Sequence, residues 1–322
     1  MKIEIDQNAG FCFGVKRAIK LAEDALKEGN EVFCLGQIVH NQSEEKRLMD
    51  LGMKTISHSD LLQLKNKTVL IRAHGEAPST YDIAAKNNLH LIEATCPIVL
   101  SLQQKIKTAW LETSQDNRQI VIVGKKQHPE TIGLAGQTYN EAIIAETPDD
   151  IKNIDSQRPV YLFAQTTISE AFFEQVKNQI IYERNSIASE ADQRYSESEE
   201  AEETSSLLSV PAMLSDKTYH AAKDVFVQKS ICNHVRTRRD GILEFAKKHD
   251  VVVLVSGKNS SNGQYLYERC RTVNKNSFFI QDETMLQPQW FEGCKSAGIS
   301  GATSTPPWLL EKVAEQIKKI SM

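Results

Sequence analysis

The stretch VVVLVSGKNSSNGQYLYERCRTV, residues 251–273, decides the fold class of this chain. It starts with five apolar residues typical of a buried strand, passes through a polar turn, and ends in an amphipathic segment typical of a helix. The same succession of strand, turn and helix recurs through most of the sequence without a close sequence repeat. Such alternation predicts an α/β fold with mainly parallel strands.

Apolar runs and amphipathic segments mark the main elements of this fold. We expect strands over residues 2–6, 31–35, 68–72, 119–123, 160–164 and 251–255. We expect helices over residues 15–27, 97–111, 169–181, 237–249, 260–273 and 308–320. Pro97 supports the second of these helices, because proline is favoured in the first helical turn.

Composition excludes several classes of protein. With 322 residues, of which 40% are hydrophobic, the chain can bury a substantial core and form two or three domains. A net charge of −4 provides no general basic field, which argues against a nucleic-acid partner. No apolar stretch approaches the roughly 20 residues of a membrane helix, and the opening MKIEID reads as a strand and not as a signal peptide. We therefore expect a cytoplasmic protein with no membrane partner.

One segment departs from the α/β pattern. Residues 183–217 are rich in Glu, Ser and Ala and have almost no apolar periodicity. Such a composition cannot bury enough surface to offset the entropy of ordering. We expect a flexible, solvated insertion, with an acidic partner-binding segment as the alternative.

Three of the six cysteines share a sequence context. Cys12, Cys96 and Cys232 each follow a strand-like stretch and open a helix-like one. The N-terminus of a helix carries positive partial charge, which favours the thiolate that binds metals. These positions predict one metal cluster where three similar units meet, with one coordination position left to a ligand other than cysteine.

The remaining cysteines, Cys34, Cys270 and Cys294, are expected to be packing residues. Three disulfides would be the alternative use of six cysteines, but the chain is long and has no secretion signal. A zinc site is disfavoured because the sequence contains no Cys-x-x-Cys pair.

Three histidines also lie in equivalent contexts. His40, His74 and His128 each follow an apolar strand. Histidine donates hydrogen bonds to anionic oxygens and transfers protons near neutral pH, so three around one cleft suit a diphosphate. Ligands of open α/β sheets gather at the carboxyl ends of strands, where these residues are expected. A structural role for each histidine is the alternative.

Two polar loops and one carboxylate complete the candidate site. Residues 256–262, SGKNSSN, follow a strand and open a helix as anion-binding loops do, although position 252 is not the glycine of a P-loop. Residues 300–307, SGATSTPP, offer further hydroxyl donors. Ordinary helix capping is the alternative for both loops. Glu130 is the carboxylate best placed for proton transfer, and Thr166 adds a hydroxyl at another strand end.

Eight motifs occur in one order: GFCFGV, VHN, AHG, ATCP, HPE, QTT, KNSSN and GATSTP. In them the chain resembles the 4-hydroxy-3-methylbut-2-enyl diphosphate reductase (IspH/LytB) family, over nearly its whole length outside the acidic segment. The resemblance implies a trefoil of three α/β lobes, with mainly parallel sheets, around a central 4Fe-4S cluster. We expect a first lobe at 13–96 with an N-terminal strand at 1–12, a second lobe at 97–181, an acidic insertion at 182–229, a third lobe at 230–304 and a C-terminal helix at 305–322.

The resemblance also implies the reaction and its redox centre. Two-electron reductive dehydroxylation of (E)-4-hydroxy-3-methylbut-2-enyl diphosphate would give isopentenyl or dimethylallyl diphosphate and water, the last step of the non-mevalonate isoprenoid route. Cys12, Cys96 and Cys232 would hold the cluster, and its fourth iron would bind the substrate's hydroxyl oxygen. The electron donor would be a ferredoxin or a flavodoxin.

Roles for the other candidate residues follow from the same resemblance. Glu130, helped by Thr166, would direct protons to the departing hydroxyl group, and Thr166 would also contact the substrate. The diphosphate would be held by His40, His74, His128, Ser260, Ser261, Asn262 and Ser304.

Two features depart from the family's pattern. The run NHVRTRR at 233–239, directly after Cys232, is more basic than in many members, so we assign it no substrate role. The acidic segment lengthens the connection to Cys232, and we expect it to loop out into solvent.

Two other interpretations of the sequence stay open. The chain could be a metal- or phosphate-binding protein that kept the cysteines without turnover, but a binder would not need Glu130. It could also be a phosphate-ester enzyme without iron, in which the cysteines only pack.

Overall fold

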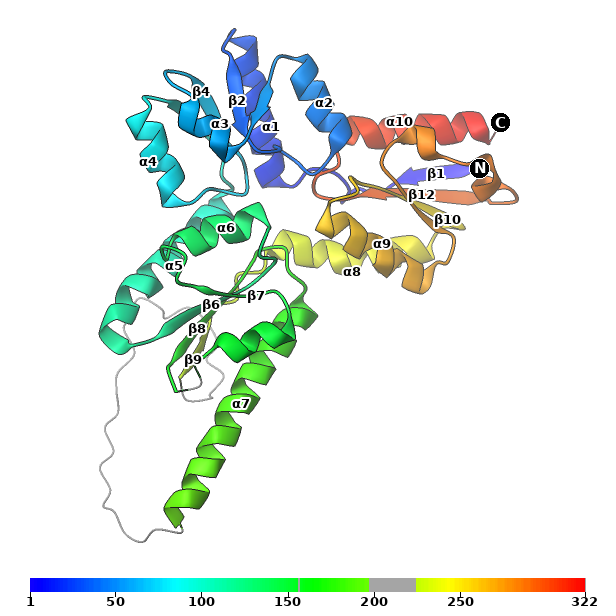
Figure 1. Ribbon diagram of the computed structural model, residues 1–322. Helices are drawn as coiled ribbons and strands as arrows, with labels where there is room; N and C mark the ends of the chain where they lie inside the picture. The colour runs from blue at the N-terminus through cyan, green and yellow to red at the C-terminus, as the bar shows by residue number, and fades with distance from the viewer. Residues whose placement is uncertain (156, 197–223, 322) are drawn as a thin grey trace. The chain divides into compact units, whose positions relative to one another are not determined.

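The computed structural model describes residues 1–155, 157–196 and 224–321, apart from the side chains of residues 113–116 and 186–196. Contacts divide the chain into a larger unit, Met1–Leu102 with Ile231–Met322, and a smaller unit, Gln103–Ser230. Three four-stranded parallel sheets form the framework of these units (Figure 1). The expected α/β class with mainly parallel strands is confirmed.

One sheet of the larger unit has the strand order β3-β2-β4-β5. In that order the strands are Lys54–Ile56, Val32–Leu35, Thr68–Ile71 and His90–Glu93. The helices of this lobe are α1 (Phe13–Lys27), α2 (Gln42–Asp50), α3 (His58–Gln63) and α4 (Pro78–Lys86). Helix α1 buries Ala18 and Ala22 against the sheet, where Cys34 is fully buried as expected for a packing residue.

The other sheet of the larger unit has the order β1-β12-β10-β11. Its strands are Lys2–Ile5, Ser296–Gly301, Val251–Val255 and Ser277–Ile280. The helices are α8 (Asn233–Lys247), α9 (Ser261–Val273) and α10 (Pro307–Ile320), with short 3-10 turns at Glu283–Met285 and Pro288–Phe291. Every residue of β10 is buried, because this apolar strand lies in the middle of the sheet with helices packed against it.

The smaller unit contains a sheet of order β7-β6-β8-β9. Its strands are Ile143–Ala145, Gln119–Val123, Val160–Ala164 and Val225–Val227. The accompanying helices are α5 (Pro97–Asp116), which starts in the larger unit, α6 (Pro129–Gly136), the 3-10 helix η1 (Pro148–Asn153) and α7 (Glu170–Ser196).

All three sheets have one topology when the strands of each lobe are numbered along the chain and β1, which comes first in the sequence, is counted after β12 as the last strand of its lobe. The order is second, first, third, fourth, and the fourth strands are β5, β9 and β1. Strand β1 therefore completes the C-terminal lobe, where Lys2 pairs with Ser296 and Ile5 with Ile299 of β12 (Figure 1). The expectation that residues 1–12 belong to the first lobe is wrong, because a strand's hydrogen-bonding partner need not be near it in sequence.

The C-terminal helix is also part of that lobe. Helix α10 packs against β1 and β12, and its Leu309, Leu310 and Val313 are buried in the same core as β10. It is not the separate element that the expected boundary at residue 305 suggested.

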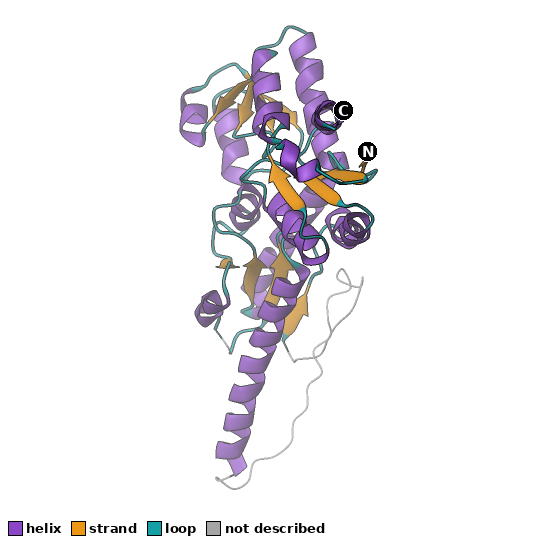
Figure 2. Cartoon of the chain, turned by 90° about the vertical axis from the view of Figure 1, so that its right-hand side faces the viewer, coloured by secondary structure: helices purple, strands orange, loops and turns teal. Residues whose placement is uncertain are grey.

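Helix α7 runs past its expected end at Ile181 to Ser196, and Figure 2 shows it extending beyond the strands of its own lobe. The expected insertion at 182–229 is thus wrong at both ends, since Val225 to Val227 form β9, in which Val225 pairs with Val160. Glu, Ala, Arg and Gln are good helix formers even where apolar periodicity is missing. Residues 197–223, the rest of that expectation, lie outside the described residues.

No helix within the described ranges is long and apolar enough to cross a membrane.

Candidate active site

Each of the three candidate ligand cysteines stands at the start of a helix, as expected. Cys12 is the N-cap of α1 and Cys232 the N-cap of α8. The carbonyl of Cys96 accepts the N–H of Leu100 at 2.9 Å, which makes it the residue that opens α5. Each cysteine also follows the fourth strand of a lobe, namely β1, β5 or β9. All three belong to the larger unit.

The three sulfur atoms influence one another electrostatically. Burial raises the pKa of the Cys12 thiol, and negative charge on Cys96 and Cys232 raises that pKa further. The backbone N–H groups of Val15 and Gly14, at the start of α1, act in the opposite direction. A raised pKa means that the Cys12 thiol keeps its proton in the absence of a metal. The three sulfur atoms at helix N-termini form a donor set that fits an iron-sulfur centre, whose positive charge would favour their thiolate forms.

Gly14 leaves the space that this donor set needs. A Cβ atom at this position would lie 2.9 Å from the Sγ of Cys96 and 3.0 Å from its Cβ. Any side chain here would therefore push Cys96 away from Cys12. The second glycine of the GFCFGV motif is explained by this close approach.

Arg238 joins the segments around the cysteines, a role that is not among those expected from the sequence. This buried side chain donates from Nη1 to the carbonyl of Gly10 at 3.0 Å and from Nη2 to the carbonyl of Gly301. Helix α8, which begins after Cys232, is thereby tied to the loop before Cys12. An arginine in the first two turns opposes the helix dipole, and this was the signal available in the sequence.

The candidate anion ligands occupy equivalent places in the three lobes. His40, His128 and Ser260 each lie five residues beyond the end of a first strand, β2, β6 or β10. His74, Thr166 and Ser304 each follow a third strand, β4, β8 or β12, by two or three residues. The first and third strands of each lobe are neighbours in the sheet, and the strand order changes direction between them. Open α/β sheets bind ligands at such a switch point.

In the larger unit, two loops meet at this position. A Cβ on Gly257 would lie 2.1 Å from the carbonyl oxygen of His40, so the two backbones touch. The ring centroids of His40 and His74 are 5.1 Å apart. Burial, aided by the positive charge of Arg72, lowers the pKa of His40, which is therefore a neutral hydrogen-bond donor at pH 7.

Hydroxyl and amide groups from the two polar loops lie beside one another. Ser260 caps α9 by accepting the N–H of Gly263 at 3.2 Å, and Ser304 Oγ lies 3.4 Å from Ser260 Oγ. Asn262 donates to Thr303 Oγ1 at 3.4 Å, while its buried Oδ1 has no partner among the described residues. Ser261, the first residue of α9, lies between Ser260 and Asn262 in the chain. An unsatisfied buried amide group marks a place for a ligand.

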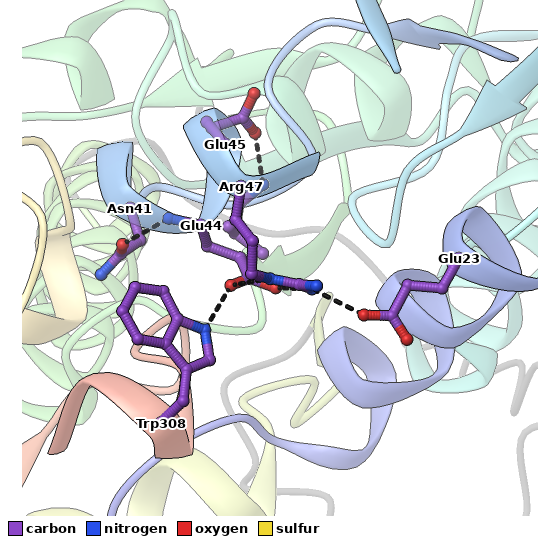
Figure 3. Close-up of polar contacts among 7 residues, drawn as sticks. Glu23, Asn41, Glu44, Glu45, Arg47 and Trp308 are labelled. Carbon is purple, nitrogen blue, oxygen red and sulfur yellow. Dashed lines mark hydrogen bonds and ion pairs between the residues drawn. The ribbon is translucent and has the colours of Figure 1, made fainter. Parts of the chain in front are cut away.

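A polar network fixes the helix that follows His40 (Figure 3). Asn41 caps α2 by accepting the N–H of Glu44 at 3.1 Å. The carboxylate of Glu44, 1% exposed, accepts from Arg47 Nε at 2.9 Å and from Trp308 Nε1 at 2.8 Å. Arg47 also pairs with Glu23 of α1 at 2.7 Å. Helices α1, α2 and α10, from two lobes of the larger unit, are thereby joined, which the sequence did not indicate.

Arg72, Glu76 and His58 form a second polar cluster in the lobe that carries His40. Arg72 is buried against Gly36, whose φ is +74° and whose Cβ would lie 2.4 Å from Arg72 Nη1. Arg72 donates to the carbonyl of Gln37 at 3.3 Å, and the carboxylate of Glu76 accepts from His58 Nε2 at 2.8 Å. These side chains position the loop that carries His40.

The smaller unit holds the candidate proton donor. Thr166 donates its N–H to Glu130 Oε1 at 2.6 Å and its hydroxyl to Oε2 at 2.8 Å. Burial raises the pKa of Glu130 to about 7, although both hydrogen bonds act to lower it. His128 caps α6 and accepts the N–H of Glu130 on Nδ1 at 3.2 Å, so the neutral ring carries its proton on Nε2.

The topology and these side chains define a three-lobed α/β protein with a candidate cysteine-ligated metal centre. Residues 3–318 match the model of a family described as LytB protein. The chain belongs to the LytB protein family.

Curated relatives and solved structures agree with this membership. A Bacteroides thetaiotaomicron protein named 4-hydroxy-3-methylbut-2-enyl diphosphate reductase is 40% identical over 318 residues, which cover 99% of this chain and 98% of the relative. A protein of the same name from Chlorobaculum tepidum is also 40% identical, with coverages of 99% and 97%.

A solved structure of (E)-4-hydroxy-3-methyl-but-2-enyl diphosphate reductase, described as the terminal enzyme of the non-mevalonate pathway, superposes with a TM-score of 0.68 at 33% identity. The superposition covers 99% of this chain and 100% of that one. The Plasmodium falciparum reductase, at 22% identity, has a TM-score of 0.75 over 98% of this chain and 87% of that one and supports the fold. The expected fold class of three α/β lobes with parallel sheets is confirmed.

Proposed function

We propose that this chain is an iron-sulfur reductase that converts (E)-4-hydroxy-3-methylbut-2-enyl diphosphate to isopentenyl diphosphate and dimethylallyl diphosphate. The reaction takes up two electrons and two protons and releases water. Relatives with this name, 40% identical over 99% of the chain, support the assignment. The observation that carries it is the set of three cysteines of the larger unit, each of which opens a helix.

Cys12, Cys96 and Cys232 would hold one 4Fe-4S cluster. The electrostatic influence of Cys96 and Cys232 on Cys12 and the space left at Gly14 support this donor set. Three cysteine ligands leave one iron of the cluster without a protein thiolate. When bound, the cluster would pass the two electrons one at a time from the electron donor and would supply a Lewis-acidic iron for cleavage of the substrate's C–O bond.

Residues at the switch points would hold the diphosphate. His40, His74 and His128 donate ring N–H groups, and the loops of α9 and β12 add hydroxyl and amide groups from Ser260, Ser261, Asn262 and Ser304. These groups neutralise the anion through directed hydrogen bonds and fix the position of the hydroxyl end of the substrate.

Glu130 would donate the proton that turns the departing hydroxyl into water. A carboxyl group with a pKa of about 7 is protonated in about half of the molecules at pH 7 and can release that proton to the substrate. Thr166 binds both carboxyl oxygens, so it sets the orientation of the acid, and it would contact the substrate beside that acid.

The electrons would come from a ferredoxin or a flavodoxin, and we place the protein in the cytoplasm. Neither a nucleic acid nor a membrane takes part in this proposal.

Anaerobic purification tests the proposal. A brown protein containing about four iron and four sulfide per chain, which forms both isoprenoid diphosphates with a chemical reductant, is expected. Cys12→Ser should lose the colour, whereas Cys294→Ser, a partly buried cysteine outside the site, should keep it. A colourless, iron-free protein would contradict the reductase, and phosphate-ester hydrolysis by such a protein would favour the iron-free alternative.

A further inference from the structure

A buried carboxylate in the first turn of α2 contacts the loop that carries His40. Glu45 is 6% exposed, and its Oε1 accepts the N–H of Val39, the residue before His40, at 3.1 Å (Figure 3). Its Oε2 accepts the hydroxyl of Thr55 in β3 at 3.3 Å. Burying a carboxylate is costly unless hydrogen bonds and a cation compensate for the lost water. An apolar side chain could fill this position at lower cost, but it could not hold the backbone of the loop.

The compensating cation is Arg72, which directly follows β4. Burial raises the pKa of Glu45, and the positive charge of Arg72 is among the effects that lower it. Arg72 is itself buried, and its Nη1 donates to the carbonyl of Gln37 at 3.3 Å. A carboxylate oxygen of Glu76 lies 3.7 Å from its Nη2. Arg72 and Glu45 therefore hold one carbonyl and one N–H of the same loop, two residues apart.

The main chain is fixed on both sides of His40. Before it, Ile38 and Val39 have buried side chains, in addition to the two polar contacts. After it, the side chain of Asn41 caps α2. The carbonyl of His40 also touches the backbone at Gly257. These contacts set the place from which the ring of His40 projects.

Arg72 also links the two loops that carry histidines. It lies two residues before His74 in the chain, and its side chain binds the loop that carries His40. Strands β2 and β4 are paired, so both loops leave the same edge of the sheet. The ring centroids of His40 and His74 are 5.1 Å apart. A spacing that is fixed before the anion arrives avoids the entropic cost of ordering the loops on binding.

We propose that Glu45 and Arg72 are positioning residues for the diphosphate site, which fix the backbone of the His40 loop and thereby the spacing of His40 and His74. The inference rests on the proposed function in one respect, namely that these histidines bind the diphosphate. Neither positioning residue has to touch the substrate. By its charge alone, a carboxylate beside an anion site opposes anion binding. A positioning role for Glu45 has the opposite sign, so a substitution can separate the two effects.

The test measures binding of inorganic diphosphate to the anaerobic holoprotein by calorimetry, and KM and kcat with a chemical reductant. Glu45→Gln and Glu45→Leu both remove the negative charge, but only glutamine keeps an oxygen that accepts the N–H of Val39. Arg72→Lys keeps the positive charge and loses the planar fork that reaches Gln37 and Glu76. The controls are Glu311→Leu and Arg271→Met, at exposed positions of α10 and α9. Iron content and urea midpoints show whether each variant is folded.

Glu45→Leu should bind diphosphate about tenfold more weakly than the parent and raise KM by a similar factor, with kcat within about threefold. Glu45→Gln should bind as the parent does, and Arg72→Lys about fivefold more weakly. The two controls should match the parent.

Parent-like or tighter binding by Glu45→Leu would overturn the proposal, because the carboxylate would then act only through its charge or not at all. Equal losses in Glu45→Gln and Glu45→Leu would overturn it as well. If Glu45→Leu does not fold, Arg72→Lys decides, and parent-like binding by that variant would contradict the positioning role. A parent that binds diphosphate without reducing the substrate would refute the reductase alone, whereas a parent that binds no diphosphate would overturn this inference.

Discussion

Thr166 binds both carboxylate oxygens of Glu130, one through its backbone N–H at 2.6 Å and the other through its hydroxyl at 2.8 Å. The two residues follow neighbouring strands, β6 and β8, so the sheet itself brings them together. Burial and hydrogen bonding act in opposite directions on this carboxyl group. Burial is the larger effect, and the resulting pKa of about 7 makes Glu130 an acid at neutral pH.

Replacing Glu130 with Gln should abolish most turnover while leaving the cluster and diphosphate binding intact. Glutamine keeps the size, an oxygen that accepts the Thr166 N–H and an NH2 group that can donate to the Thr166 hydroxyl, but it has no acidic proton to transfer. General acid catalysis contributes about 100- to 10,000-fold. Steady-state kinetics with a chemical reductant, iron analysis and calorimetric titration with inorganic diphosphate check this prediction. Glu170→Gln, at an exposed position in α7, is the matched control. Full activity of the Glu130 variant would refute its role.

The rate should depend on pH through the same group. The protonated acid is present below the folded-state pKa of about 7, so kcat/KM should fall about tenfold per pH unit above it. Thr166→Val removes a hydrogen bond that favours the carboxylate and should therefore move the midpoint to higher pH. Thr166→Ser retains the hydroxyl and should leave the midpoint in place. Anaerobic pH–rate profiles of the parent, Thr166→Val and Thr166→Ser test this prediction. The same midpoint in all three would contradict the effect of the Thr166 hydroxyl on the pKa of Glu130.

Adding a methyl group at Gly14 should damage the cysteine site. A Cβ 2.9 Å from Cys96 Sγ forces that cysteine to move, so Gly14→Ala should purify with much less iron per chain than the parent. Gly241→Ala is the control, since a Cβ there meets nothing within 4 Å and the position lies inside α8. Alanine should stabilise that helix by about 0.5–1 kcal/mol. Equal iron content in both variants would contradict the steric argument.

Removing Arg238 should destabilise the larger unit. Arg238→Met leaves the carbonyls of Gly10 and Gly301 without their donor in a buried setting, at a cost of about 2–4 kcal/mol. Anaerobic urea unfolding measures this loss. Arg236→Met, an exposed neighbour on the same helix, should change stability by less than about 0.5 kcal/mol. If both variants unfold at the parent's urea concentration, the two bonds contribute nothing to stability.

Glu44 should matter both for stability and for substrate binding. Glu44→Ala leaves Trp308 Nε1 without its acceptor and loosens the pair with Arg47, which should cost about 2–4 kcal/mol (Figure 3). Because α2 begins directly after the His40 loop, KM for the diphosphate substrate should rise more than kcat falls. Urea unfolding and steady-state kinetics test this, with exposed Glu315→Ala in α10 as the control. An unchanged KM would show that the polar network around Glu44 does not position the residues that bind the diphosphate.

Local sequence patterns were sufficient for the fold class and for most of the candidate site. The positions of Cys12, Cys96 and Cys232 at helix starts follow from a strand-like run before each and a helix-like run after it. The meeting of Glu130 with Thr166 follows from two polar residues at the ends of neighbouring strands. The predicted end of α7 at Ile181 falls short of its observed end at Ser196. Apolar periodicity does not mark a helix whose good helix-forming residues lack a buried face.

The alternating α/β pattern and the helix starts at the cysteines can be predicted from the sequence, because each depends on residues that are near one another in the chain, and the family follows from short motifs that are each local. Only the tertiary structure decided that β1 is the fourth strand of the C-terminal lobe, that Arg238 reaches Gly10, and that Trp308 reaches Glu44. It also decided the acidity of Glu130, since the desolvation that raises this pKa comes from whatever the fold packs around the carboxyl group. Strand pairing and burial depend on contacts between segments that are distant in the chain, so no local sequence pattern specifies them.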